Sequence, residues 1–151
     1  MSKSFSDLGI NPLLQQGLAD LNISVPTDIQ RKTIPVVLNQ NQDLVALAKT
    51  GTGKTAAFGL PLLQLIDTEN TNIQAVILAP TRELGHQIHA NLISFASHSP
   101  TISIAAVCGG IPIKPQIERL KTATHIVVAT PGRLVDLIKR GAINIKNTKY
   151  L

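Results

Sequence analysis

Residues 48–55 read AKTGTGKT and stand between an apolar run at residues 43–48 and a segment of helical character that reaches about Ile66. A short apolar run that ends in glycines predicts a strand, so the local order is strand, glycine loop and helix. Glycines allow backbone amides to turn toward one point, and the first turn of a helix adds a partial positive charge there. This stretch therefore predicts an α/β fold with a loop that binds the phosphate groups of a nucleotide.

The last two residues of the loop carry its side-chain chemistry. Lys54 is placed to neutralise the β- and γ-phosphates of ATP, and Thr55 is placed to ligate Mg²⁺. We expect the other contacts to come from the residues before them, which are Lys49, Thr50, Gly51, Thr52 and Gly53. A glycine-rich turn without a ligand is the alternative interpretation, and the expected strand and helix on either side favour ATP.

The rest of the chain alternates between short apolar runs and segments of helical period. We expect strands at residues 75–79, 102–107 and 126–129, and a further buried strand that opens at Tyr150 and Leu151. We expect helices that begin near Pro12, Thr27, Thr81, Ile113 and Pro131. Strands that alternate with helices predict parallel pairing, so the expected architecture is a parallel sheet with flanking helices.

Two of the expected helices have a clear apolar side. In the helix that begins at Pro12, this side consists of Leu14, Leu18 and Leu21. In the helix that follows Thr81, it consists of Leu84, Ile88, Leu92 and Phe95. We expect Asn11, Thr27, Thr81 and Thr130 to cap the helices that follow them.

The composition fits one compact domain or part of one. Of the 151 residues, 44% are apolar and 15% are charged, and no apolar run approaches the roughly 18 residues of a membrane span. A net charge of +5 suits a polyanionic partner without requiring one, and 3% aromatic residues disfavour a platform on which bases stack. The single Cys108 is expected in the core. The N-terminal residues carry neither a secretory signal nor a lipidation motif, so we expect a cytoplasmic protein without membrane contact.

Four further segments accompany the glycine loop. They are Phe5 with PTDIQ at residues 26–30, PTREL at residues 80–84, the pair Gly109 and Gly110, and TPGR at residues 130–133. With the loop, in this order and spacing, they resemble the Q motif (5–30), motif I (48–55), motif Ia (80–84), the GG motif (109–110) and motif Ib (130–133) of DEAD-box ATP-dependent RNA helicases. The resemblance covers nearly the whole chain, and it implies an incomplete RecA-like P-loop NTPase domain, the first of the two helicase domains.

The Q motif admits two interpretations. The resemblance implies that Phe5 packs on the adenine of ATP and that Gln30 hydrogen-bonds the edge of the base. Thr27 and Gln30 also have the spacing of a capping box, in which Gln30 turns back to the backbone of Thr27.

The three remaining motifs are implied to contact the sugar-phosphate backbone of RNA without reading its sequence. The implied contacts are Pro80, Thr81, Arg82, Gly109, Gly110, Thr130, Pro131, Gly132 and Arg133. Helix starts offer free amides and their arginines offer charge-assisted hydrogen bonds to phosphate. The alternative is structural, because Thr81 and Thr130 are also ordinary helix caps.

The resemblance also implies what lies outside these residues. In the family a second RecA-like domain closes on ATP and RNA to separate short duplexes, and the segment Asp-Glu-Ala-Asp holds Mg²⁺. The 151 residues lack that segment, so we expect no ATP turnover from them alone, and we expect exposed apolar surface beside the phosphate loop. A DNA translocase or other non-RNA ATPase and a non-catalytic partner-binding fragment are the alternatives.

Overall fold

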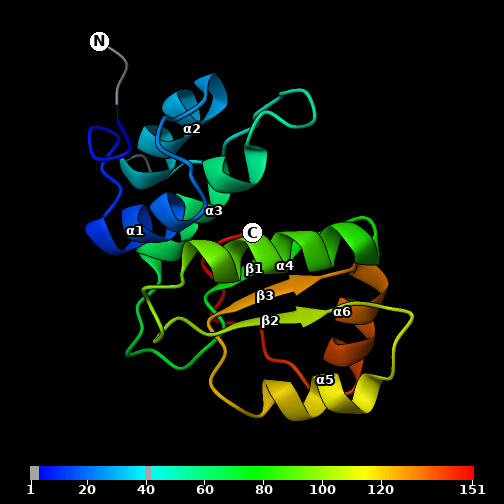
Figure 1. Ribbon diagram of the computed structural model, residues 1–151. Helices are drawn as coiled ribbons and strands as arrows, with labels where there is room; N and C mark the ends of the chain where they lie inside the picture. The colour runs from blue at the N-terminus through cyan, green and yellow to red at the C-terminus, as the bar shows by residue number, and fades with distance from the viewer. Residues whose placement is uncertain (1–3, 40–41) are drawn as a thin grey trace. The chain divides into compact units, whose positions relative to one another are not determined.

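The computed structural model describes residues 4–39 and 42–151, which form two compact units (Figure 1). The first unit contains residues up to 65 together with 91–100, and the second contains 66–90 and 101–151. The phosphate loop and PTDIQ belong to the first unit. PTREL, the glycine pair and TPGR belong to the second.

The second unit is built on a parallel sheet. Its strands are β1 (Ala75–Leu78), β2 (Ile104–Val107) and β3 (Ile126–Ala129), in the order β1-β3-β2. Its helices are the first part of α4 (Arg82–Phe95), then α5 (Ile113–Leu120) and α6 (Pro131–Lys139). Figure 1 shows α4 over one face of the sheet, with α5 and α6 on the other side. The predicted parallel α/β arrangement is therefore confirmed.

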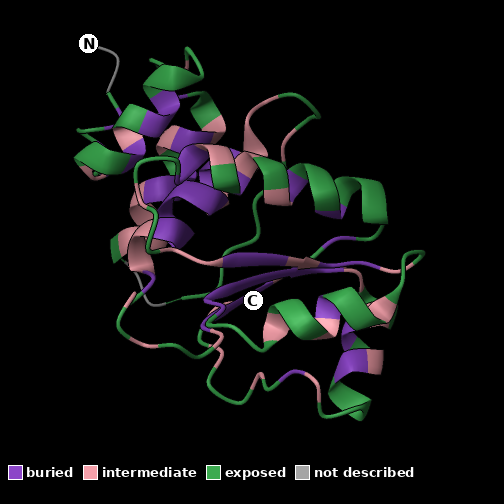
Figure 2. Cartoon of the chain, turned by 60° about the horizontal axis from the view of Figure 1, so that its bottom comes forward, coloured by how far each residue is buried: buried purple, intermediate pink, exposed green. Residues whose placement is uncertain are grey.

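The strands are apolar along their whole length because helices cover both faces of the sheet. All four residues of the central strand β3 are buried, and Figure 2 shows most of the sheet in the colour of buried residues. On the side of α5 and α6, Val76, Val107 and Val127 pack with Leu134 and Leu137. Cys108, directly after β2, is fully buried, so its predicted place in the core is confirmed.

The first unit is helical where the structure describes it. Its helices are α1 (Pro12–Asp20), α2 (Asp28–Asn39), α3 (Lys54–Leu65) and the end of α4. Asn11 caps α1 as predicted, because its side chain accepts a hydrogen bond of 3.0 Å from the amide of Leu14. The prediction for Leu21 is wrong. The helix ends before it, since Asn22 takes a left-handed conformation with φ +57°, and Leu21 is 41% exposed.

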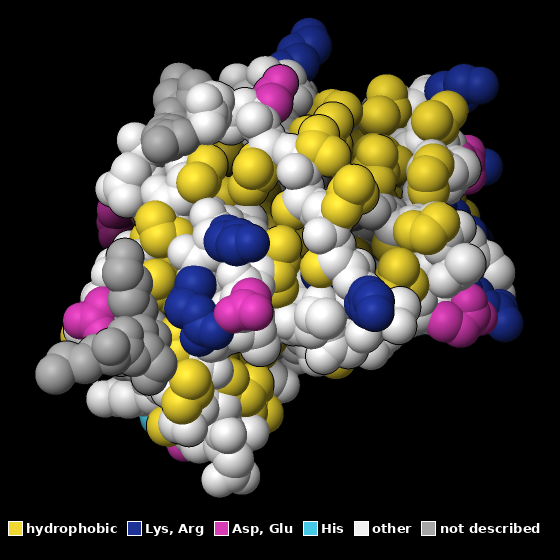
Figure 3. Space-filling model, turned by 90° about the horizontal axis from the view of Figure 1, so that it is seen from above, with side chains coloured by type: hydrophobic (Ala, Val, Ile, Leu, Met, Phe, Trp, Pro, Cys, Tyr) yellow, Lys and Arg dark blue, Asp and Glu magenta, His cyan; other side chains and the backbone are white. Residues whose placement is uncertain are grey.

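The predicted strand at residues 43–48 is wrong. These residues form no ladder with any described strand, and Val45 and Leu47 are 87% and 91% exposed. A β-strand is stabilised by hydrogen bonds to an adjacent strand, and the apolar sequence of one segment does not show whether such a strand lies beside it. The expected exposure of apolar side chains beside the phosphate loop is confirmed, and Figure 3 shows hydrophobic side chains at the surface of the chain.

Two smaller predictions are confirmed in part. The predicted apolar side of α4 is buried at Ile88, Leu92 and Phe95, but Leu84 is exposed at the first turn. Tyr150 forms a parallel bridge to Ala75 at the free edge of β1, whereas Leu151 is exposed rather than buried. Within the described ranges, no helix combines the length and hydrophobicity needed to cross a bilayer.

Candidate functional site

The phosphate loop curves around the ammonium group of its own lysine. Lys54 is the first residue of α3, and its Nζ donates to the carbonyl oxygens of Ala48 (2.6 Å) and Lys49 (2.7 Å). Gly51 and Gly53 have φ of +77° and +86°, a region that residues with a Cβ seldom adopt. The glycines therefore shape the curve, and Lys54 occupies its inside.

Lys54 also has an uncompensated charge. Within residues 4–39 and 42–151, no carboxylate forms an ion pair with it. An ammonium group has three hydrogen atoms to donate, and the loop carbonyls take two of them. The positive end of the α3 dipole lies at the same place. The loop can therefore receive an anionic ligand, and Thr55 follows Lys54 as the second residue of α3.

Thr27 and Gln30 fasten α2 to this loop. Gln30 is buried; its Oε1 accepts from the amide of Thr27 (2.9 Å) and its Nε2 donates to the carbonyl of Gly53 (3.1 Å). The hydroxyl of Thr27 donates to the carbonyl of Thr52 (2.8 Å). The predicted return of Gln30 to Thr27 is therefore present, and the rest of the capping box is replaced by bonds to the loop. A contact between Gln30 and a base stays a prediction.

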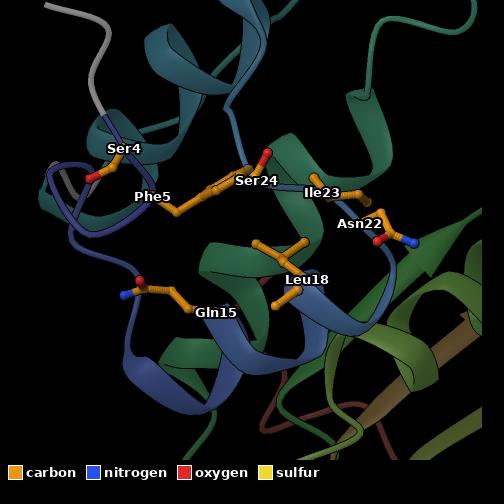
Figure 4. Close-up of a pocket in the computed structure, with 8 residues that line it drawn as sticks. Ser4, Phe5, Gln15, Leu18, Asn22, Ile23 and Ser24 are labelled. Carbon is orange, nitrogen blue, oxygen red and sulfur yellow. The ribbon is translucent and has the colours of Figure 1, made fainter.

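Phe5 lies in a separate hollow from Thr27. It is buried and lines a cavity of about 330 Å³ together with Leu18 and Ile23, whose side chains surround the same space in Figure 4. Thr27 instead lines a cavity of about 400 Å³ with Ala48. The structure thus brings Thr27 and Gln30 to the phosphate loop without placing Phe5 in the same cavity as Thr27. Packing of Phe5 on adenine stays a prediction.

In the second unit, the three other motifs follow three neighbouring strands. PTREL follows β1, the glycine pair follows β2, and TPGR follows β3. The strands are parallel, so their carboxyl ends share one edge of the sheet. This is the edge at which open α/β sheets bind their ligands.

Contacts connect these motifs to one another. The hydroxyl of Thr130 accepts from the amide of Gly109 (3.0 Å), and Nη2 of Arg133 donates to the carbonyl of Ile111 (3.0 Å). A Cβ on Gly110, whose φ is +81°, would lie 2.7 Å from Nη1 of Arg82. The three motifs therefore form one continuous surface, which we call the turn surface: Pro80, Thr81, Arg82, Gly109, Gly110, Thr130, Pro131, Gly132 and Arg133.

The two helix starts of the turn surface differ. Thr81 caps α4 as predicted, since its hydroxyl accepts from the amide of Leu84 (3.3 Å). The prediction that the Thr130 side chain caps α6 is wrong, because no capping hydrogen bond forms there. Strand β2 lies beside β3, so the amide of Gly109 comes within reach and takes that hydroxyl instead.

Two arginines give the turn surface its charge. Arg82 is largely exposed, and its Nε lies 2.5 Å from Oε1 of Glu83. The hydrogen bond and charge of Glu83 raise the pKa of Arg82, and the same contact lowers the pKa of Glu83. Nη1 of Arg133 is buried and has no hydrogen-bond partner among the described residues.

One polar residue near the turn surface was missed by the sequence analysis. Gln116 on α5 is 6% exposed, and its Nε2 donates to the carbonyl of Cys108 (3.0 Å). A signal was available, because Gln116 interrupts the helical stripe formed by Ile113, Ile117 and Leu120.

A family model described as DEAD/DEAH box helicase matches residues 27–151. The chain belongs to the DEAD/DEAH box helicase family. Over 147 residues it is 45% identical to a probable ATP-dependent RNA helicase of Methanocaldococcus jannaschii, covering 97% of this chain and 39% of that protein. It is 44% identical to the DEAD-box ATP-dependent RNA helicase CshA of Streptococcus pneumoniae, covering 97% of this chain and 28% of that protein.

Solved structures of DEAD-box proteins share the fold. A crystal structure of a DEAD box protein from Methanococcus jannaschii matches with a TM-score of 0.90 at 42% identity, over 97% of this chain and 40% of that one. Saccharomyces cerevisiae Dbp5 bound to RNA and ADP BeF3 matches with a TM-score of 0.87 at 30% identity, over 98% of this chain and 37% of that one. The chain thus spans well under half the length of these DEAD-box relatives.

Proposed function

We propose that the protein containing this chain is an ATP-dependent RNA helicase, which binds ATP on the first unit and the backbone of RNA on the turn surface. The observation that carries the proposal is the convergence of three motifs, distant in sequence, on the carboxyl ends of three adjacent strands. Relatives that are named ATP-dependent RNA helicases, and a related structure that contains RNA and ADP BeF3, support it.

ATP binding is assigned to the residues of motif I. Backbone amides of residues 49–53 and the ammonium of Lys54 would hold the phosphate groups, with the N-terminus of α3 adding its positive end. Thr55 would hold Mg²⁺, which supplies charge neutralisation on the phosphate oxygens. Lys54 would exchange its bonds to the carbonyls of Ala48 and Lys49 for bonds to phosphate oxygens. Phe5, Thr27 and Gln30 are proposed to select adenine.

RNA binding is assigned to the turn surface. Arg82 and Arg133 would bond phosphate oxygens, while the helix starts at Thr81 and Thr130 and the turn at Gly109 and Gly110 would offer backbone amides. These groups contact phosphate and sugar, so binding would not depend on base sequence. A second RecA-like domain of the same protein is the proposed partner for unwinding or remodelling of short duplexes, and a cytoplasmic location stays a prediction.

ATP binding is tested by calorimetry on the full-length protein with Lys54→Ala. Charge-assisted hydrogen bonds contribute roughly 1.5–3 kcal/mol, so we expect ATP affinity to fall by about 10- to 100-fold. Lys114→Ala, which removes an exposed lysine of α5, is the matched control and should leave the affinity unchanged. Unchanged ATP affinity in the Lys54 variant would refute the assignment.

RNA binding is tested by fluorescence anisotropy with short single-stranded RNAs of unrelated sequence. We expect Arg133→Ala to weaken all of them by a similar factor, about 10-fold, and to lower the slope of log affinity against log salt by about 0.7. The same measurement with duplex DNA distinguishes an RNA helicase from the alternative function, a DNA translocase. Binding and ATPase stimulation by duplex DNA but not by RNA would favour a DNA translocase.

A further inference from the structure

Among the described residues, three glutamines are buried: Gln30, Gln74 and Gln116. Each fastens a loop through its amide. Gln30 holds the phosphate loop, as described above. Gln74 closes the turn before β1: its Oε1 accepts from the amide of Asp67 (3.0 Å), and its Nε2 donates to the carbonyls of Asp67 (2.7 Å) and Asn70 (3.0 Å).

Gln116 fastens the turn after β2, which carries the glycine pair. Its Nε2 donates to the carbonyl of Cys108 at 3.0 Å and makes a longer contact of 3.5 Å with that of Pro112. These two carbonyls flank the turn on either side of Gly109 and Gly110. The side-chain amide of Gln116, on α5, therefore links the residue before the glycine pair to a residue after it.

Gln116 differs from the other two glutamines in one respect. Its Oε1 is buried and accepts no hydrogen bond from any residue in the described ranges, whereas Gln30 and Gln74 use both atoms of their amides. Burial of an unpartnered polar atom is unfavourable, and its helical neighbours Ile113 and Ile117 pack against the apolar core. If packing alone mattered, an apolar side chain would suit the position better. The bonds from Nε2 to the turn therefore explain the presence of glutamine.

We propose that Gln116 is a positioning residue of the RNA site. Gln116 bonds the carbonyls of Cys108 and Pro112 and thereby fixes the turn between them. This turn presents the amides of Gly109 and Gly110. It also presents the carbonyl of Ile111, to which Arg133 donates. The inference rests on the proposed function of the turn surface and extends it to a residue that lies outside the five motifs. Gln116 acts through the turn and does not itself touch RNA.

The experiment replaces Gln116 by methionine in the full-length protein. Gln116→Met keeps the length and helix propensity of the side chain and removes the amide. We expect the affinity for a single-stranded RNA to fall at least about 5-fold, the loss of one net hydrogen bond, while ATP affinity stays unchanged. Where the methionine variant does not fold, Gln116→Leu serves, because it also removes the amide and brings no charge into the buried position.

A matched control separates positioning from stability. Gln74→Met removes an equally buried glutamine that holds a turn at the amino end of β1, the edge of the sheet opposite to the turn surface. We expect it to lower the melting temperature at least as much as Gln116→Met and to leave RNA affinity unchanged. Equal loss of RNA affinity in both variants would mean that Gln116 acts only through stability, which overturns the proposal.

A double variant gives the second readout. Gln116 fixes the same turn whose carbonyl at Ile111 is bonded by Arg133, so Gln116→Met combined with Arg133→Ala should lose less RNA affinity than the sum of the two single losses. Additive losses, or wild-type RNA affinity in Gln116→Met, would overturn the inference. If Arg133→Ala alone binds RNA like the wild type, the proposed function fails instead, so the two failures are distinguishable.

Discussion

Gly85 lies in the first turn of α4, where its lack of a side chain makes room for Cys108. A Cβ at this position would lie 2.9 Å from Sγ of Cys108, closer than side chains pack, and both residues are buried. Alanine favours a helix over glycine by about 1 kcal/mol, so the glycine is retained against helix propensity. The two residues therefore form a size-matched pair between α4 and the end of β2.

We expect Gly85→Ala to destabilise the protein by about 1 kcal/mol, because overpacking outweighs the gain in helix propensity. In a Cys108→Ala background the sulfur is gone, and the same change should stabilise by up to about 1 kcal/mol. Urea unfolding of the wild type, the two single variants and the double variant measures the coupling free energy between the two positions. An identical effect of Gly85→Ala in both backgrounds would contradict the pairing.

His125, directly before β3, makes stability depend on pH. It is 3% exposed, and its Nδ1 accepts from the amide of Ser103 (3.0 Å), so the neutral ring carries its proton on Nε2. Burial lowers the pKa of His125, against a smaller opposing effect of Asp67, and burial also lowers the pKa of His89. As the pH falls below about 6.5, the unfolded chain therefore takes up protons before the folded chain does.

Stability should therefore be fully present above about pH 6.5 and decline below it, by at most about 1.4 kcal/mol per pH unit for each histidine. His125→Asn keeps an oxygen that can accept from Ser103 and removes the titration. We expect its free energy of unfolding, measured in urea between pH 7.5 and 5, to fall less steeply than that of the wild type. A wild-type slope in the variant would show that His125 does not titrate in this range.

For the helices and strands, the sequence predicted what local physics determines. Helices α1 and α4 were found from a capping residue followed by leucines and isoleucines at helical spacing, and β1 and β3 from short apolar runs between helices. Residues 43–48 read equally apolar but form no strand, because pairing depends on a neighbour that lies elsewhere in the chain. The same limit applies to Leu21, whose exposure follows from the left-handed Asn22.

The contact between α2 and the phosphate loop depends on one of two glycines in the loop. Gly51 and Gly53 both have positive φ, so alanine is strained at either position. A Cβ at Gly51 has open space around it, whereas one at Gly53 would overlap Nε2 of Gln30. We expect Gly53→Ala to displace that amide and weaken ATP binding clearly more than Gly51→Ala, as measured by calorimetry.

The displacement of Gln30 has its own control. If it accounts for the extra loss, Gln30→Ala should weaken ATP binding by itself, and Gly53→Ala should add little more in that background. Equal affinities for the Gly51 and Gly53 variants would show that strain in φ, and not the contact with α2, governs the loop.

For the whole molecule, the motifs could be predicted and the connections between them could not. The spacing of the motifs predicted that the residues of motifs I, Ia, GG and Ib lie on loops that follow a strand or open a helix, although the strand predicted before motif I is wrong. The bond from Gly109 to Thr130 and the packing of Arg82 on Gly110 depend on which strands are neighbours, and no pattern along the chain contains that information. The bond from Gln116 to Cys108 could not be predicted for the same reason, although the interruption of the apolar stripe of α5 by Gln116 was visible in the sequence.

Exposed apolar residues beside the phosphate loop predict the behaviour of the 151-residue chain in solution. Val45 and Leu47 present their side chains almost entirely to solvent, a feature that promotes association. We expect the chain to self-associate at micromolar concentration, and Val45→Lys with Leu47→Lys to shift it toward the monomer, because charge opposes contact between apolar segments. Light scattering across a concentration series measures the shift.

The control is Val135→Lys, which adds a charge at a half-exposed valine on α6, away from the 43–48 segment in the sequence. If it disperses the chain equally, net charge and not the 43–48 segment controls association.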